Sequence, residues 1–192
     1  MRRHLLLLAV LSIYLLAATA TAAAQVSQEL SYDDGSVDFG NSGINGWYNS
    51  VRFSLPAGWS SAELLTARFY IYSNPSQFKL HILASDRATE LIVPFMTTPP
   101  TVGWYDIDVS GRSIIVTGDF YLVIEYLSAS TGYPYIGADT SGPFDGRSWC
   151  YYPPGAPVPQ TGWVQASATT DYTIRAVVRY YTAPPSSQLL VS

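Results

Sequence analysis

The sequence predicts an all-β protein, a single antiparallel β-sandwich of the jelly-roll kind with roughly eight to eleven strands. Short segments in which apolar and polar residues alternate are the first sign of this fold. Turn-forming Gly, Pro, Asn and Asp residues recur about every eight to fifteen residues, a spacing typical of sandwiches and barrels. No segment shows the spacing of apolar residues that an amphipathic helix requires.

The strongest strand signal lies at residues 118–127, where a Gly-Asp turn precedes a run rich in Val, Ile, Phe and Tyr. Because successive side chains of a strand point to opposite faces, one set enters the core and Glu125 lies on the other face. The core set consists of Phe120, Leu122, Ile124 and Tyr126. This segment is therefore expected to be a central strand.

Eight further segments alternate or form short apolar runs, and most end at a turn such as Pro56-Ala57-Gly58 or Asn74-Pro75-Ser76. In chain order these expected strands are residues 29–32, 47–55, 64–72, 78–83, 91–96, 104–109, 113–117 and 172–181. Residues 128–162 are expected to form a long irregular region that contains a strand-like segment at 148–152. The sequence shows no internal repeat.

The N-terminus has the features of a secretory signal peptide. A basic start with Arg2 and Arg3 precedes an apolar run that is too short to cross a bilayer comfortably, and Ala22-Ala23-Ala24 fits a cleavage site. We therefore expect a signal peptide at residues 1–24, a sandwich domain at 25–182 and a Pro- and Ser-containing tail at 183–192. Secretion to the extracellular space or cell surface follows, with no membrane span after cleavage.

The charge of the chain argues against binding to nucleic acid or to anionic membranes. The net charge is −4, and loss of Arg2 and Arg3 makes the mature chain more acidic. No cluster of lysines or arginines is present to neutralise phosphates. The oligomeric state is not indicated.

Few residues could carry catalysis. The one cysteine, Cys150, cannot form an intramolecular disulfide and is expected to be a small buried side chain. His81 is the only histidine after the signal peptide, and no Gly-x-Ser-x-Gly motif accompanies it. A hydrolase that uses the strand carboxylates Asp106, Asp108 and Glu125 stays open, because their separation in space is unknown. A non-catalytic role is expected.

Four strands carry one charged residue near their centre, on the face opposite their aliphatic residues: Arg52, Arg68, Glu125 and Arg175. The plain interpretation is a row of cross-strand ion pairs on one sheet, with Glu125 bridging arginines. The alternative makes Glu125 a catalytic base, because a neighbouring arginine lowers a carboxyl pKa.

The segment 33–38 is rich in oxygen ligands and could hold Ca²⁺ through Asp33, Asp34 and Asp38. Asp and Gly are also the residues that tight turns prefer, and the segment does not match an EF-hand loop. Calcium is therefore a possible ligand, and no other cofactor is expected.

Aromatic residues provide the main binding hypothesis. Rings in the loops and at the strand ends could stack on a sugar or contact a partner protein, or they could close the ends of the sandwich. The expected ligand-binding residues lie in or beside the long region 128–162, and they are Tyr133, Tyr135, Trp149, Tyr151, Tyr152 and Trp163.

Several segments resemble a β-sandwich accessory module of secreted and cell-surface proteins in bacteria and archaea. The resemblance rests on Tyr32-Asp33-Asp34-Gly35-Ser36 and on residues 103–110, 118–125, 146–148 and 171–177. It implies a jelly-roll-like fold and a surface location, and it assigns no catalytic residues. We therefore expect a secreted, non-catalytic module that binds carbohydrate or protein at the cell surface. The alternatives are an extracellular hydrolase and a structural subunit that assembles by strand addition.

Overall fold

The computed structural model describes residues 25–129 and 132–181, and these residues form fourteen strands and one 3₁₀ turn, η1 (Ser110–Arg112). Residues 27–180 make up one compact unit. Gln25, Val26 and Tyr181, at the outer ends of the first and last strands, fall outside this unit. The expected signal peptide and tail lie outside the described residues, so the expected domain boundaries stay predictions.

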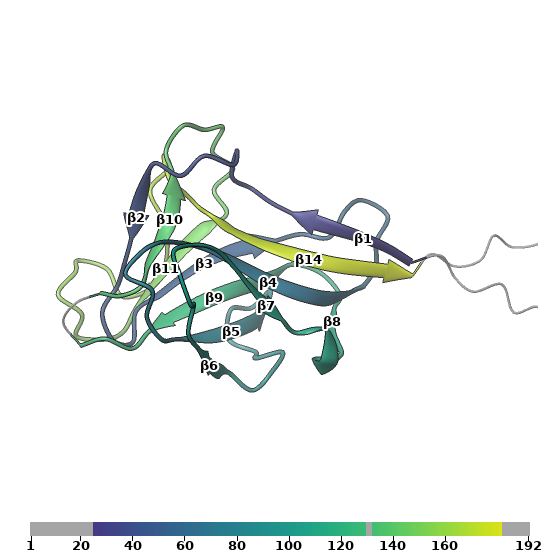
Figure 1. The fold of residues 1–192 in the computed structure, drawn as a ribbon, viewed down its shortest axis with the longest axis horizontal. Coiled ribbons are helices and arrows are strands. Elements are labelled where there is room, and N and C mark those ends of the chain that lie inside the picture. Colours follow the sequence, from purple (N-terminus) through teal and green to yellow (C-terminus); the bar gives the residue numbers. More distant parts are fainter. Residues whose placement is uncertain (1–24, 130–131, 182–192) are drawn as a thin grey trace, which may run out of the picture. The chain divides into compact units, whose positions relative to one another are not determined.

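The first sheet has eight strands and is organised around the longest one, β4 (Ala62–Ser73). In the strand order, β4 lies between β14 and β10, and it also pairs with β7 and β8. Figure 1 shows β4 beside β14. The other members of this sheet are β1 (Gln25–Leu30), β2 (Phe39–Asn41), β7 (Gly103–Asp108), β8 (Ile114–Val116), β10 (Tyr135–Asp139), β13 (Asp171–Tyr172) and β14 (Ile174–Tyr181).

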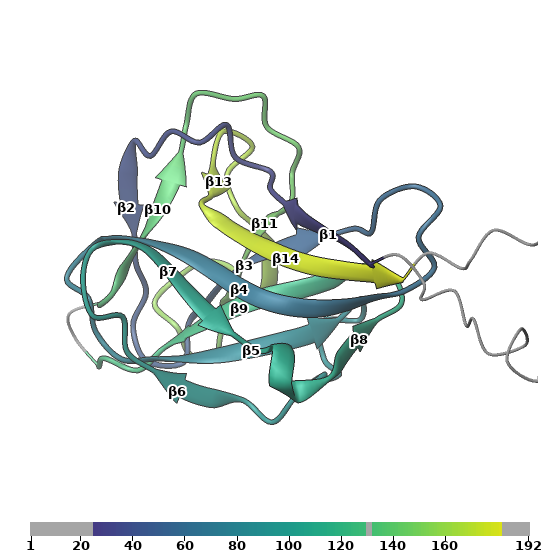
Figure 2. The same cartoon turned by 45° about the vertical axis from the view of Figure 1, so that its right-hand side comes forward.

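The second sheet has six strands in the order β12-β11-β3-β9-β5-β6. Figure 2 labels all of them except β12. Its strands are β3 (Tyr48–Phe53), β5 (Phe78–Ala84), β6 (Phe95–Thr97), β9 (Phe120–Tyr126), β11 (Ser148–Tyr152) and β12 (Gly162–Gln165). Every strand pair whose register is defined is antiparallel. The expected all-β, antiparallel sandwich is confirmed.

The core lies between the two sheets, and β9 is its central strand as expected. Phe120, Leu122, Ile124 and Tyr126 of β9 are fully buried against the aliphatic sets of β4, β5 and β14. Cys150 is also buried here, with its Sγ 2.9 Å from the hydroxyl of Tyr172. Tyr121 and Val123 are buried on the other face of β9, so this strand is covered on both sides.

Three expected strand assignments were wrong in detail. The region 128–162 was expected to contain one strand-like segment at 148–152, which is β11, but it also contains β10. The expected last strand is divided into β13 and β14, because Thr173 leaves β14 and pairs its backbone with Gly137 and Tyr70. Only the last two residues of the apolar run 91–96 belong to a strand, β6 (Phe95–Thr97), and Val93 is 82% exposed.

One buried carboxylate has no neutralising partner. Asp171 lies opposite Asp139 in the β10–β13 pair, and it is 2% exposed. Neither of its carboxylate oxygens makes a hydrogen bond of normal geometry. Burial, followed by the negative charges of Asp145, Asp139 and Asp33, raises the pKa of Asp171 to about 6. The folded state therefore favours the protonated form of this side chain.

This arrangement predicts that the fold gains stability when the solution is acidified. A carboxyl whose pKa is raised on folding destabilises the folded state when ionised, and this cost disappears as pH falls through about 6. We expect the free energy of unfolding to increase by about 1 kcal/mol between pH 8 and pH 5, and Asp171→Asn to remove that increase. Denaturant titrations at both pH values test this. Equal pH profiles for the two proteins would contradict it.

Candidate functional site

The outer face of the six-stranded sheet carries a continuous cross-strand row of polar and aromatic side chains. Each member lies directly opposite the next one in the antiparallel register. From β5 to β12 the row consists of Lys79, Glu125, Tyr48, Tyr151 and Trp163. Directly opposite side chains in a sheet are in contact distance, so the register itself assembles the row.

The aromatic members pack on one another and remain partly exposed. The ring centroids of Tyr48 and Tyr151 are 5.0 Å apart and stacked, and those of Tyr151 and Trp163 are 5.4 Å apart. Trp149 lies on the same face of β11 as Tyr151. We call Tyr48, Trp149, Tyr151 and Trp163 the aromatic patch. Tyr121 and Val123 lie buried beneath it.

The structure separates the rings that the sequence grouped as ligand-binding residues. Trp149, Tyr151 and Trp163 come together in the aromatic patch. Tyr152 points to the opposite face of β11, where its ring meets Trp47 edge-on at 4.7 Å and packs against the core. The other two rings, Tyr133 and Tyr135, pair with each other at 5.8 Å beside the eight-stranded sheet.

A short hairpin loop after β5 closes over one side of the aromatic patch. The indole Nε1 of Trp163 donates to the backbone carbonyl of Arg87 at 3.1 Å, and the Arg87 guanidinium lies 4.3 Å from the centre of the Trp149 ring. The loop is held in shape by Asp86, whose carboxylate accepts from the backbone of Ala88 and Thr89. We call residues 86–90 the covering loop.

An ion cluster adjoins the aromatic patch. The two ring nitrogens of His81 lie 2.6 Å from Glu90 Oε1 and 2.8 Å from Glu125 Oε2, and Lys79 Nζ is 2.8 Å from the same Glu125 oxygen. Burial opposes ionisation of Glu125, but hydrogen bonds from Lys79 and His81 outweigh it and lower the pKa of the carboxyl. Burial, together with the nearby charges of Glu125 and Glu90, raises the pKa of Tyr48 to about 12. The Tyr48 hydroxyl is therefore uncharged at neutral pH.

The expectation that Glu125 bridges arginines on one sheet was wrong. Arg68 and Arg175 lie on the outer face of the other sheet, where Asp106 and Asp33 each bind one of them through two hydrogen bonds and Glu29 contacts both. The indole of Trp104 packs on both guanidiniums and is 42% exposed. Arg52 shares the sheet of Glu125 but pairs with Asp119 at 3.8 Å.

The strand carboxylates do not form the pair that a glycoside hydrolase needs. Asp106 and Asp108 belong to the eight-stranded sheet, whereas Glu125 belongs to the six-stranded sheet. The carboxylate that does face Glu125 is Glu90, and the imidazole of His81 occupies the space between them. A sugar bond cannot enter that space while the imidazole fills it.

The three carboxylates proposed for calcium serve different partners. Asp33 binds Arg175; Asp34 accepts from the Ser36 backbone at 2.8 Å and from the Ser141 hydroxyl at 2.9 Å; Asp38 accepts from Thr140. In the described ranges, no three His, Cys, Asp or Glu side chains are placed to hold a metal ion. These contacts explain the Asp-rich sequence as a loop fastened to β14 and to the turn after β10.

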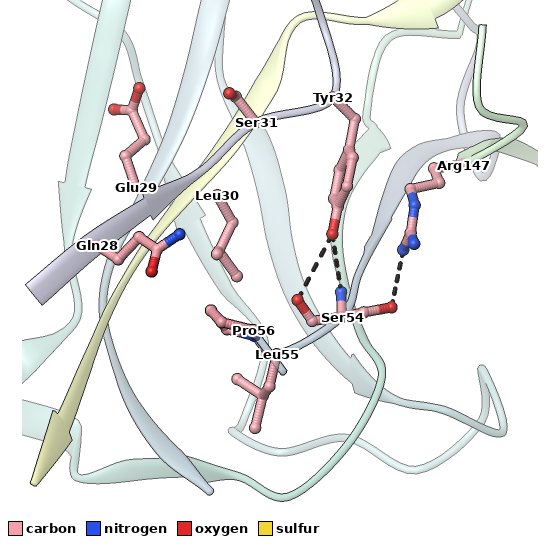
Figure 3. Close-up of a pocket in the computed structure, with 9 residues that line it drawn as sticks. All are labelled: Gln28, Glu29, Leu30, Ser31, Tyr32, Ser54, Leu55, Pro56 and Arg147. Atoms are coloured by element: carbon pink, nitrogen blue, oxygen red, sulfur yellow. Dashed lines mark hydrogen bonds between the residues drawn. The ribbon is translucent and has the colours of Figure 1, made fainter. Parts of the chain in front are cut away.

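A cavity of about 450 Å³ lies between β1 and the residues that follow β3 (Figure 3). The Tyr32 hydroxyl contacts the Ser54 backbone, and Arg147 donates to the Ser54 hydroxyl at 2.8 Å. The Arg147 guanidinium also packs on the Tyr32 ring at 4.2 Å. Because its polar groups already bond to one another, this cavity is a weaker candidate site than the aromatic patch.

The sequence did not identify Tyr48, His81, Arg87 or Glu90 as members of a site. Alternation within residues 78–83 correctly places Lys79 and His81 on the outer face. What the sequence lacks is the register between strands, which brings Tyr48 next to Tyr151 and Glu125.

Comparison with known proteins relates the chain to parts of bacterial proteases. It is 28% identical over 176 residues to bacillopeptidase F of Bacillus subtilis (strain 168), a match that spans 82% of this chain and 11% of that protein. No family model matches the sequence. In the described residues, no helix is long and apolar enough to cross a membrane.

A similar fold occurs in the crystal structure of the cysteine protease and lectin-like domains of Cwp84, a surface layer associated protein of Clostridium difficile. The TM-score is 0.51 at 10% sequence identity, and the match covers 82% of this chain and 36% of that one. The likeness is to the lectin-like domain and not to a catalytic part. It supports the sandwich fold. The chain thus spans about a third or less of these relatives.

Calcium binding at Asp33, Asp34 and Asp38 stays a prediction with a simple test. Should Ca²⁺ bind, a hundredfold excess over its dissociation constant would stabilise the fold by about 2.7 kcal/mol and raise the melting temperature. Thermal unfolding in chelator and in millimolar Ca²⁺ measures this, with Mg²⁺ as the control. Equal melting temperatures would contradict the prediction.

Proposed function

We propose that this protein is a surface-associated, non-catalytic module that binds carbohydrate on the aromatic patch. The observation that carries the proposal is the packed row of partly exposed rings, Tyr48, Tyr151 and Trp163, on an open sheet face. Aromatic rings that are fixed by their neighbours offer flat apolar surfaces at low entropic cost. The apolar face of a sugar ring fits such a surface, and its hydroxyl groups would meet the polar end of the row.

The comparisons support this proposal in general terms. The similar fold is a lectin-like domain of a surface protein, and both similar proteins are bacterial and contain protease parts that this chain does not match. A module that attaches a secreted protein to a glycan at the cell surface is consistent with these two relatives. Export through the expected signal peptide belongs to the same proposal.

The ion cluster favours binding over hydrolysis. A retaining or inverting hydrolase places its sugar between two carboxyl groups. Here His81 is 6% exposed and lies between Glu90 and Glu125, where it is held by two short contacts. We therefore propose no catalytic residues.

Substitutions in the aromatic patch should weaken glycan binding without unfolding the protein. Trp163→Ala and Tyr151→Ala each remove a partly exposed ring, and we expect a loss of about 1 kcal/mol or more, roughly fivefold in the dissociation constant. A glycan array identifies the ligand, and titration calorimetry with the best oligosaccharide measures the loss.

Trp104→Ala provides the matched control, because Trp104 is an exposed tryptophan on the outer face of the other sheet. It should leave the affinity unchanged. A loss with Trp104→Ala and none with Trp163→Ala would move the site to the eight-stranded sheet. If the protein binds no glycan on the array, the proposed function is wrong.

A further inference from the structure

Glu90 is the more exposed of the two carboxylates in the ion cluster. Its Oε1 contacts His81, and its side chain is 34% exposed. Its second oxygen, Oε2, has no hydrogen-bond partner within the part of the chain that the structure describes. Glu125 is only 13% exposed, and its Oε2 contacts both Lys79 and His81. Glu90 is thus the carboxylate that a ligand could reach.

His81 fixes the direction of the Glu90 carboxylate. Both ring nitrogens of His81 lie within 2.8 Å of a carboxylate oxygen, so the ring contacts Glu90 through one nitrogen and Glu125 through the other. The charged groups that face this ring are Glu90 from the covering loop, Glu125 from β9 and Lys79 from β5, while Tyr48 of β3 is neutral. The imidazole is therefore held between the two carboxylates, and its contact with Oε1 orients Glu90.

The backbone places Glu90 beside the rings. Glu90 forms an isolated bridge with Leu83, and the next residue, Leu91, donates to the Ile82 carbonyl at 2.8 Å. The Tyr48 ring lies 5.2 Å from the His81 ring, and the charge of Glu90 contributes to the raised pKa of Tyr48. The same loop contacts Trp149 and Trp163 through Arg87. A ligand stacked on Tyr48 and Tyr151 would therefore lie next to Glu90.

We propose that Glu90 selects the ligand of the aromatic patch by accepting hydrogen bonds from hydroxyl groups of an uncharged sugar, and that His81 is its positioning residue. This inference rests on the proposed carbohydrate function. An ionised carboxylate can only accept hydrogen bonds, so it binds donors such as sugar hydroxyl groups and repels the carboxylate of a uronic acid. The proposed ligand class is therefore uncharged sugars with free hydroxyl groups, and the site should not bind uronic acids.

The test begins with an array that carries neutral and uronic acid oligosaccharides, probed with the full protein. The expected result is binding to neutral oligosaccharides and none to the uronic acids. Calorimetry with the best neutral oligosaccharide then compares Glu90→Gln with Glu29→Gln. Glu29 is the matched control, because it is a glutamate that pairs with Arg68 and Arg175 on the opposite sheet. We expect at least a fivefold loss for Glu90→Gln and no change for Glu29→Gln, with thermal unfolding confirming that both variants fold.

The positioning role has its own readout, the coupling between the two side chains. His81→Ala should weaken binding, because the Glu90 carboxylate is then no longer held, and His81→Gln, which can still donate to Glu90, should restore most of the affinity. Added to Glu90→Gln, His81→Ala should cause no further loss. A further loss in the double variant would overturn the positioning role.

The outcomes separate this inference from the proposed function. If wild-type protein binds and Trp163→Ala weakens it, but Glu90→Gln binds as wild type, the aromatic site stands and the role of Glu90 is overturned. Preferential binding of uronic acids also overturns it. Absence of glycan binding by the wild-type protein overturns both.

Discussion

The antiparallel register of β9 with β3 and β5 is the constraint on which the candidate site depends. β9 is buried on both faces. Its inner side chains pack in the core, and its outer side chains Tyr121 and Val123 pack beneath the aromatic patch, so both faces fix the position of the strand. Because side chains alternate with a period of two, a slip of one residue would turn the whole set to the wrong face. Fixing β9 therefore fixes which residues lie opposite Glu125 on both sides, Tyr48 and Lys79.

Much of the fold could be predicted from the sequence, because the inner face of each strand is encoded locally. Alternation identified the buried residues of β9 and placed Lys79, His81 and Glu125 on the outer face of their sheet. Alternation within β11 also contained the signal that Tyr152 points away from Trp149 and Tyr151, although the sequence interpretation grouped them. Residues 128–162 were harder, because their strands are short and are separated by proline-rich turns.

The site itself could be predicted only in part, since it depends on pairing between distant segments. Trp163 reaches the aromatic patch from β12, and Glu90 reaches it from the covering loop. Arg68, Arg175 and Glu125 each lie near the centre of a strand with a similar alternating pattern. The two arginines nevertheless belong to the eight-stranded sheet, and Glu125 belongs to the six-stranded sheet. The alternation within one strand indicates that a side chain points away from the core. Which side chains lie next to it depends on how the strands pair.

The two parts of the proposed site come from different kinds of element: the rings come from strands, and Glu90 and Arg87 come from the covering loop. The rings stand on strands whose opposite faces form the core, so any change in their spacing would disturb packing throughout the sandwich. Glu90 and Arg87 come from a short hairpin loop outside that core, and loops of this kind accept substitution and length change. Under the proposed function, related modules could therefore change the sugar that they recognise by varying one hairpin, while the stacking surface and the fold remain unchanged.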